Sequence, residues 1–401
     1  MRVVVAPDKF KGSLTAREVA DRVAAGITAA LAETGAPAAD VVTVPVADGG
    51  DGTVDAALAA GFERVPVRAE GPTGSPVDTA FAVREGVAVV EMADVSGLRL
   101  LAPDRLAPLT ASSYGTGQVV RAALDRGCHT VVLGIGGSAS TDGGAGMVEA
   151  LGARLLDGAG AELPRGGAAL GALDRVDLTG LHPRLARTRL VVASDVDNPL
   201  LGPTGAAAVY GPQKGADPQQ VALLDAALAR WAEAVDAAVD DAADGSAGSP
   251  QDRRAATGPG TPFRDRPGAG AAGGVGYAAM AVLGGELEPG IDLILDLVRF
   301  ADHLTGARLV ITGEGSLDEQ TLHGEAPAGV AAAAAAVGVP VVAVAGRLAL
   351  APERLRAAGI EAAYALTDIE PDVTRCLAEA GPLLEQLAAK LARDRLVPSR
   401  S

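Results

Sequence analysis

The chain repeats one local pattern: a short, β-branched apolar run stops at a turn made of glycines and acidic residues. The segments with this pattern are Val3–Gly12, Val41–Gly52, Val131–Gly144, Leu190–Leu201 and Leu309–Thr321. Parallel strands present their carboxyl ends at one edge of a sheet, and glycine lets backbone N–H groups approach a ligand closely there. The pattern therefore predicts an α/β fold that brings these turns to one cleft.

The order of the expected elements divides the chain into two α/β domains. Near both ends of the chain, strands alternate with helices, as in doubly wound folds. Between residues 63 and 92, consecutive strands joined by glycine turns are typical of antiparallel hairpins. We therefore expect a doubly wound, Rossmann-like domain made of residues 1–66 and 286–401. A mixed α/β domain of residues 67–285 would be inserted into it, with the active site in the cleft between the two domains.

Several further expectations concern single segments. Arg308–Ile311 should be a strand, and Val373–Ala392 should form one terminal helix. Leu151–Gly167 is rich in glycine and is expected to be a loop. Asp240–Pro267 is rich in Gly, Pro, Ala, Asp and Arg, which predicts a mobile or poorly ordered loop.

Composition excludes several classes of function. The 401 residues carry a formal net charge of −16, so a basic surface for nucleic acid or for an anionic membrane is not expected. The two cysteines, Cys128 and Cys376, form no CxxC pair, which favours a reducing, cytoplasmic location. Met1–Ala6 is too short for a signal peptide, and no apolar stretch of about 18 residues lacks charges or helix breakers.

Lysine is rare in this chain, which makes its positions informative. Only four lysines stand against thirty arginines. Lys9 and Lys11 lie between the expected strand Arg2–Ala6 and a helix that begins with the capping-box segment Thr15–Glu18. A helix N-terminus favours an anion, and a compact ammonium suits phosphate. We therefore expect these two lysines, and Lys214 in another glycine-rich turn, to bind phosphate or carboxylate; a solvated loop with chance charges is the alternative for the first two.

The glycine-rich turns do not match the common nucleotide-binding fingerprints. No lysine has the spacing of a Walker A loop. Gly134–Ala139 fits GxGxxA directly after an expected strand, but no acidic residue ends a strand about 20 positions later. Gly268–Gly273 fits GxGxxG but does not follow a strand. A nicotinamide-dependent oxidoreductase is therefore the weaker alternative, since these glycines can equally hold a phosphate or a small carboxylate.

Acidic residues recur at the expected carboxyl ends of the strands. They are Asp8, Asp48, Asp51, Asp142, Asp195, Asp197, Glu314 and Asp318. Aspartate is common in turns and helix caps, which explains part of this set, but its concentration at one edge favours a chemical role. In phosphoryl transfer, one carboxylate can take the proton of an alcohol and others can hold Mg²⁺, while a lysine neutralises charge on the transferred group.

Taken together, these segments resemble the bacterial glycerate kinase family (type 1, glycerate 2-kinase). The matching blocks are Ala6–Leu14, Pro45–Thr53, Ser113–Gly117, Gly134–Gly144, Ser194–Leu200, Tyr210–Ala216, Gly270–Gly274 and Thr312–Gly315, with Asp318, Gln320 and Thr321. They follow one another from residue 6 to beyond residue 320, so the resemblance covers most of the chain. Each block is unspecific by itself, whereas the ordered set is highly specific.

The resemblance implies an enzyme, a glycerate kinase that uses ATP and Mg²⁺ to convert D-glycerate to 2-phospho-D-glycerate. In this interpretation Asp195 is the first candidate for the catalytic base and Asp48 the second, and Lys9 assists catalysis. Asp197 and Glu314 are the candidate metal ligands. The residues expected to bind substrate or phosphate are Asp8, Lys11, Gly49, Gly50, Gly136, Gly137, Ser138, Asn198, Lys214, Gly313 and Gln320.

One departure from the family pattern affects the choice of substrate. The family usually carries a lysine in a GKxP pattern after Thr321, where this chain has Glu325 in Gly324–Pro327. The reversed charge keeps open a kinase for another short hydroxy acid, and formation of 3-phosphoglycerate is a further alternative. A non-catalytic metabolite sensor is a third. The expected partners are the small-molecule substrate and a second copy in a homodimer, with no nucleic acid and no membrane.

Overall fold

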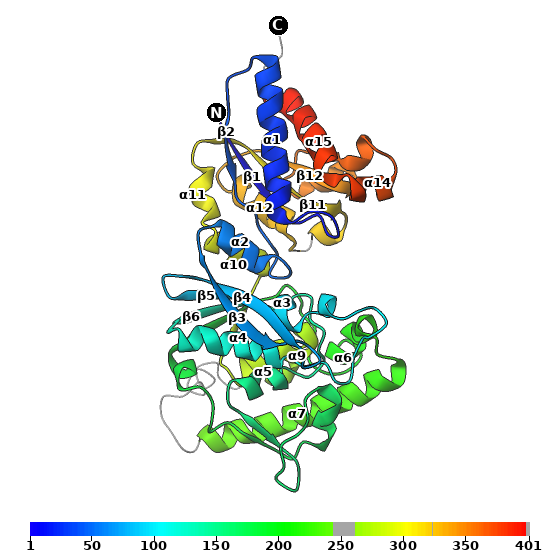
Figure 1. Ribbon diagram of the computed structural model, residues 1–401. Helices are drawn as coiled ribbons and strands as arrows, with labels where there is room; N and C mark the ends of the chain where they lie inside the picture. The colour runs from blue at the N-terminus through cyan, green and yellow to red at the C-terminus, as the bar shows by residue number, and fades with distance from the viewer. Residues whose placement is uncertain (244–260, 323, 398–401) are drawn as a thin grey trace. The chain divides into compact units, whose positions relative to one another are not determined.

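The computed structural model describes residues 1–243, 261–322 and 324–397. The chain folds into two compact units, shown in Figure 1. Unit 1 consists of Met1–Asp48, Asp55–Gly61 and Pro289–Ser401, and unit 2 consists of Gly49–Val54 and Phe62–Glu288. Both contain helices packed on a sheet with parallel strands, which confirms the expected α/β class.

Unit 1 is built on a five-stranded sheet in which all neighbouring strands are parallel. Its strands are β1 (Arg2–Pro7), β2 (Asp40–Thr43), β11 (Ala307–Leu317), β12 (Val341–Leu348) and β13 (Ala362–Ala365). Its helices are α1 (Ala16–Thr34), α2 (Thr53–Ala59), α10 (Gly290–Leu297), α11 (Phe300–Leu304), α12 (Ala326–Ala335), α13 (Pro352–Ala357), α14 (Val373–Ala378) and α15 (Ala380–Arg395).

The order of these strands defines where a ligand should bind to unit 1. They lie in the order β13-β12-β11-β1-β2, so the chain reverses its direction across the sheet between β1 and β11. In open parallel sheets, ligands bind outside the carboxyl ends of the strands at such a switch point. The carboxyl ends of β1 and β11 are therefore the first place to search for a site.

Helices cover both faces of this sheet, because alternate residues of β1 belong to different cores. Val3 and Val5 pack with α1, α14 and α15, whereas Val4 and Ala6 pack with α10, α11 and α12. Figure 1 shows α1 and α15 side by side. A strand that is buried on both faces explains the continuous apolar run at the start of the sequence.

Unit 2 is built on a mixed sheet of six strands in the order β10-β9-β6-β5-β4-β3. The strands are β3 (Glu63–Glu70), β4 (Pro76–Arg84), β5 (Val87–Glu91), β6 (Thr130–Gly134), β9 (Arg189–Ala193) and β10 (Glu286–Glu288), with a separate hairpin of β7 (Arg154–Leu156) and β8 (Arg175–Asp177). The helices are α3 (Ala93–Ser96), α4 (Tyr114–Asp125), α5 (Ala145–Ala150), α6 (Ala206–Tyr210), α7 (Pro218–Ala243) and α9 (Ala271–Ala281). The β3–β4 and β4–β5 pairs are antiparallel, and the remaining pairs of the large sheet are parallel.

One continuous core fixes the helices of unit 2 on its sheet. Leu133 of β6 and Val192 of β9 belong to a cluster that also contains residues of α4, α5, α7 and α9. Trp231 of α7 is fully buried, and its indole N–H donates to the carbonyl of Gly143 at 3.0 Å. The long helix α7 is thereby tied to the turn that follows β6.

Several segments differ from the sequence-based expectation. Strand β11 does not stop at Ile311 but continues to Leu317. The expected terminal helix is broken into α14 and α15 at Glu379, because Pro382 has no N–H to donate to the preceding turn. The expected loop Leu151–Gly167 contains β7, and α7 extends into the expected loop Asp240–Pro267. Most of that loop, residues 244–260, lies outside the described residues.

Among the described residues, no helix combines the length and the apolar character that crossing a bilayer requires.

Candidate active site

The switch point of unit 1 carries a buried carboxyl group. Asp8 follows β1 directly, is only 7% exposed, and donates its backbone N–H to the carbonyl of Gly313 at 2.8 Å. Its Oδ1 accepts the backbone N–H of Lys9 at 2.6 Å and lies 3.6 Å from the Lys9 ammonium nitrogen. Burial raises the pKa of Asp8 to about 7; the charge of Lys9 opposes this shift, and the charge of Asp48 adds to it.

A second carboxyl group reaches the same edge from β11. Glu314 lies just beyond Gly313, the last residue of β11 that pairs with β1, and the hydroxyl of Thr321 donates to its Oε1 at 2.5 Å. Burial raises the pKa of Glu314 to about 9, against the Thr321 hydrogen bond, and the nearby Glu325 and Asp8 add to the increase. The pKa of Glu325 is also raised, chiefly by burial. The edge therefore gathers Asp8, Glu314 and Glu325, and Lys9 offsets only part of their negative charge.

This edge fits a magnesium ion that arrives with phosphates. No group of three or more His, Cys, Asp or Glu side chains is arranged to hold a metal within the ranges that the structure describes. Mg²⁺ does not need such a group, because it commonly keeps several waters and takes one or two carboxylates together with substrate phosphates. Asp8 and Glu314 are hard oxygen donors of the required kind. Asp197, the other expected metal ligand, is an exposed residue of unit 2.

Three further expected residues of unit 1 lie near these carboxyl groups in the sequence and differ in exposure. Lys11 is exposed in the turn after β1. Gln320 is also exposed, and its backbone N–H donates to Asp318 at 2.9 Å. Gly313 is buried inside the sheet, where a Cβ atom would come within 2.1 Å of the carbonyl oxygen of Val344. The need for glycine at position 313 is thus explained by strand packing.

In unit 2, two glycine turns pack directly against each other. A Cβ atom on Gly134 would lie 2.7 Å from the carbonyl oxygen of Gly49, and one on Gly136 would lie 2.6 Å from the Cα of Gly50. Gly136 also donates its backbone N–H to the Gly49 carbonyl at 3.4 Å. The following Gly137 is exposed and has a left-handed backbone (φ 72°). The structure therefore brings together four glycines that the sequence assigned to substrate or phosphate binding.

Glu91 holds one of these glycine turns, and sequence analysis gave it no role. It ends β5, is 5% exposed, and accepts the backbone N–H groups of Gly52 and Val54 at 3.1 Å. Burial raises its pKa to about 8, Asp94 adds to the shift, and the two N–H donors oppose it. An acidic residue at the end of the apolar run VAVVE was the available sequence signal.

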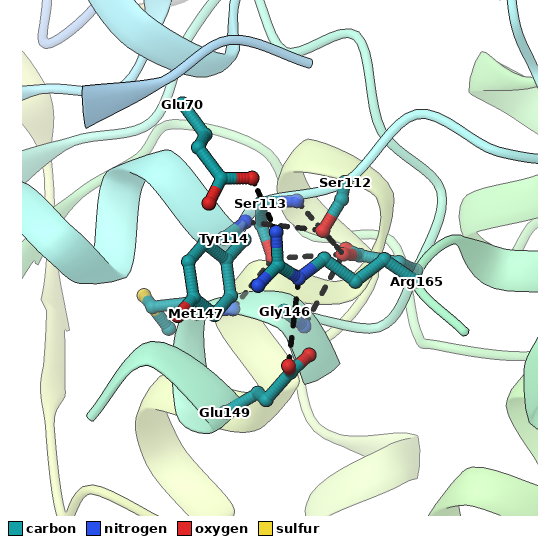
Figure 2. Close-up of polar contacts among 9 residues, drawn as sticks. Glu70, Ser112, Ser113, Tyr114, Gly146, Met147, Glu149 and Arg165 are labelled. Atoms are coloured by element: carbon teal, nitrogen blue, oxygen red, sulfur yellow. Dashed lines mark hydrogen bonds and ion pairs between the residues drawn. The ribbon is translucent and has the colours of Figure 1, made fainter. Parts of the chain in front are cut away.

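Asp142 organises the turn after β6. It is 1% exposed and accepts the backbone N–H of Ser113 at 2.8 Å and its hydroxyl at 2.9 Å. It also accepts the backbone N–H groups of Gly144 and Gly146 at 3.2 and 3.3 Å. Figure 2 shows Ser112 and Ser113, which directly precede α4, close to Gly146 of α5. These bonds identify Asp142 as a structural acceptor at the start of α5.

Arg165 lies beside Tyr114, the first residue of α4, as Figure 2 shows. Its guanidinium carbon lies 3.3 Å from the centre of the Tyr114 ring, an arrangement that attracts the cation to the aromatic face. The guanidinium also pairs with Glu70 and, at 3.4 Å, with Glu149. The start of α4 is therefore fastened both from the core and from the surface.

The loop after β9 carries the residue expected to be the base. Asp195 and Asp197 are exposed, and neighbouring Asn198 is half-buried. Asn198 donates its amide N–H to the carbonyl of Thr204 at 2.8 Å and accepts the hydroxyl of Tyr210 at 2.6 Å. Asn198 thus has a structural role in this loop, and Asp195 is exposed toward solvent.

Lys214 takes an unexpected position. It is 1% exposed, and its ammonium donates to the hydroxyl oxygen of Ser138 at 2.9 Å and to the carbonyl of Ser140 at 2.5 Å. Burial lowers its pKa to about 7, and the charge of Asp142 opposes the shift. The buried ammonium therefore holds the residues that follow Gly136 and Gly137 through these two hydrogen bonds.

Open α/β sheets bind ligands outside the carboxyl ends of their strands. The sheet of unit 1 carries carboxyl groups and a lysine at that edge, and the sheet of unit 2 carries glycine turns, residue types that suit enzymes that bind phosphorylated small molecules. Comparison with known proteins makes this class specific. The chain matches the glycerate kinase family over residues 3–396. It therefore belongs to the glycerate kinase family, whose members are phosphotransferases.

Individual relatives agree over almost the full length. A glycerate kinase from Bacillus subtilis (strain 168) is 40% identical over 395 residues, which are 98% of this chain and 97% of the relative. A glycerate 2-kinase from Escherichia coli (strain K12) is 42% identical over 352 residues, 87% of this chain and 86% of the relative. A crystal structure named for glycerate kinase 2 of Salmonella typhimurium LT2 superposes with a TM-score of 0.80 at 39% identity, covering 98% of each chain.

Proposed function

We propose that this protein is an ATP- and Mg²⁺-dependent kinase that phosphorylates D-glycerate to 2-phospho-D-glycerate. The observation that carries the proposal is the acidic switch point of unit 1, where Asp8 and Glu314 lie with Lys9 in a chain of the glycerate kinase family. Burial and neighbouring acidic groups raise the pKa of both carboxyl groups, and a bound cation would stabilise their ionised forms. The name of the Escherichia coli relative favours position 2 for the phosphate.

The proposed reaction transfers the γ-phosphoryl group of ATP to the C2 hydroxyl of D-glycerate. Asp195 takes the hydroxyl proton as the alcohol oxygen bonds to phosphorus and the bond to the ADP oxygen breaks. Asp48 is the second candidate for this base. Glu314 and Asp8 would hold Mg²⁺, which would offset the charge of the phosphates. The Lys9 ammonium offsets part of the same negative charge and keeps the Asp8 carboxylate oriented.

The glycine turn after β6 is proposed to bind the acidic end of the substrate. Gly136 and Gly137 have no side chain, so a ligand can approach the backbone of this turn closely, and the Ser138 hydroxyl offers a donor. Because Lys214 donates to the oxygen of Ser138, the hydroxyl hydrogen of Ser138 is available for a substrate oxygen. This arrangement suits a small carboxylate.

The second candidate function is a kinase for another short hydroxy acid. It is favoured by Glu325, whose carboxyl group interacts with Glu314 where the family usually has a lysine. A panel of short hydroxy acids under identical conditions separates the two candidates. A higher kcat/KM for any of them than for D-glycerate would replace the first proposal with the second.

The test of the proposed function measures ADP release from D-glycerate, ATP and Mg²⁺, with one control that lacks substrate and one that contains EDTA. Phosphorus NMR of the product reads the phosphorylated position. We expect metal-dependent turnover and phosphate on C2. Turnover with phosphate on C3 would correct the position, and no turnover with ATP still bound would overturn D-glycerate as the acceptor.

A further inference from the structure

Two loops with proposed functions begin side by side in unit 2. Strands β6 and β9 are parallel neighbours, and Gly134 at the end of β6 pairs with Ala193 at the end of β9. The β6 loop, residues 135–142, carries Ser138, and the β9 loop, residues 194–199, carries Asp195. The spacing of the two loops beyond the strand ends must be set by contacts other than the sheet.

One short segment reaches both loops. It runs from Tyr210, the last residue of α6, through a single helical turn to Lys214. Tyr210 donates its hydroxyl to Asn198 of the β9 loop at 2.6 Å, and Lys214 donates to Ser138 and Ser140 of the β6 loop. The two side chains are separated by only three residues, so neither loop can shift relative to the other without breaking a bond.

Each contact is supported by its surroundings, by further hydrogen bonds at Asn198 and by burial at Lys214. The side chain of Asn198 also donates to the carbonyl of Thr204, and the backbone carbonyl of Asn198 accepts the backbone N–H of Gly270 at 2.8 Å. On the other side, the Lys214 ammonium is enclosed, with 1% of the residue exposed, and the charge of Asp142 acts on it. A buried ammonium without these acceptors would be costly, so the position of the β6 loop and the burial of Lys214 depend on each other.

We propose that Tyr210 and Lys214 are paired positioning residues, and that the segment between them braces the β6 and β9 loops at a fixed spacing. Neither side chain contacts the substrate in this proposal. Lys214 acts through Ser138, whose hydroxyl hydrogen it directs outward, and Tyr210 acts through Asn198 on the loop of Asp195. The proposal rests on the proposed function, because it assigns these loops to one substrate.

The brace is tested with Tyr210→Phe, Lys214→Met and the double variant. The matched control is Tyr277→Phe, which removes a hydroxyl that donates to the carbonyl of Ala232 at 3.3 Å elsewhere in the core of unit 2. A misplacement of about 1 Å can cost roughly 100-fold in rate. We expect each brace variant to lower kcat with D-glycerate about 10- to 100-fold on this scale, with ADP affinity unchanged. The control should stay within about twofold of wild type, as expected away from the site.

The double variant tests whether the two residues form one device. If each side chain holds the same spacing, losing the second adds little, and the double variant should resemble the more damaged single variant. Fully additive losses would overturn the shared brace. So would a Tyr210→Phe enzyme with wild-type kcat.

Amide hydrogen exchange keeps the test independent of activity and of the substrate. The Tyr210→Phe protein should exchange faster than wild type in residues 135–142 as well as in 194–199, whereas Tyr277→Phe should not change either loop. Faster exchange confined to residues 194–199 would overturn the brace. If wild type shows no glycerate kinase turnover but the two loops loosen together, the proposed function fails while the brace stands.

Discussion

Single residues decide the proposed chemistry, and Asp195 is the most demanding case. Its exposed carboxylate would remove a proton from the substrate hydroxyl. Asp195→Asn keeps the size of the side chain but removes the base, so we expect kcat to fall by at least ~100-fold with little change in ATP binding. Initial-rate kinetics and calorimetric titration with ATP measure the two quantities.

The matched control for this variant is Asp104→Asn, which neutralises another exposed aspartate of unit 2. It should retain the wild-type kcat. An Asp195→Asn enzyme within about threefold of wild type, far below the scale of general-base catalysis, would remove Asp195 from the role of base and direct attention to Asp48.

The sequence predicted the residue types at the site better than it predicted what each residue touches. Asp8 directly follows β1 as the pattern placed it, whereas Glu314 lies within β11 because that strand continues to Leu317. Lys214 was expected to meet phosphate, but its burial behind Ser138 depends on contacts between segments more than 70 residues apart. Glu91 was missed for the same reason, because its partners Gly52 and Val54 come from a distant turn.

At the scale of elements, local signals predicted the starts of helices more reliably than the ends of strands. The Thr15–Glu18 capping box is formed as expected at the start of α1. Strand β11 continues past its glycines because β12 pairs with it as far as Leu317, a tertiary effect that no local pattern encodes. The break between α14 and α15 could have been predicted, since Pro382 is in the sequence.

Helix α9 provides a prediction at this scale, because its first turn is left-handed. Gly273 has φ 71°, and a Cβ atom there would lie 2.1 Å from the carbonyl oxygen of Ser140 in the β6 loop. Gly273→Ala combines a disfavoured backbone with overpacking, so we expect it to lower the free energy of unfolding by about 2–4 kcal/mol. It should also lower kcat, because the β6 loop must move.

The neighbouring residue supplies the control for this variant. Ala272 already has a left-handed backbone, with φ 53°. Ala272→Gly relieves that strain, so it should be neutral or stabilising by up to about 1 kcal/mol. Urea denaturation measures both variants. Equal stability of Gly273→Ala and wild type would show that the close approach to Ser140 is not needed.

At the scale of the whole molecule, the buried carboxyl groups and Lys214 make the stability of the protein depend on pH. Carboxyl groups with raised pKa values, such as Glu91, bind more protons in the folded state than in the unfolded state between their ordinary pKa and their folded pKa. The stability that these groups contribute is fully present at a pH below their pKa in the unfolded state. It is lost as the pH rises through their pKa in the folded state. Lys214, whose pKa is lowered to about 7, has the opposite effect above that pH, since the unfolded state then binds the extra proton.

Glu91 allows one contribution to be isolated, because Glu91→Gln keeps the side chain neutral while an amide oxygen can still accept from Gly52 or Val54. The folded pKa of Glu91 is about 8. Raising the pH from 5 to 8 should therefore lower the free energy of unfolding of the wild type by about 2–4 kcal/mol more than that of Glu91→Gln. The other titrating groups are common to both proteins, so they cancel in the difference.

Trp231 is the only tryptophan and is buried in unit 2, so its fluorescence during urea unfolding without metal reports on the unit that contains Glu91. Parallel stability curves for the two proteins would show that Glu91 is already ionised in the folded state, and that the Gly52 and Val54 donors outweigh its burial.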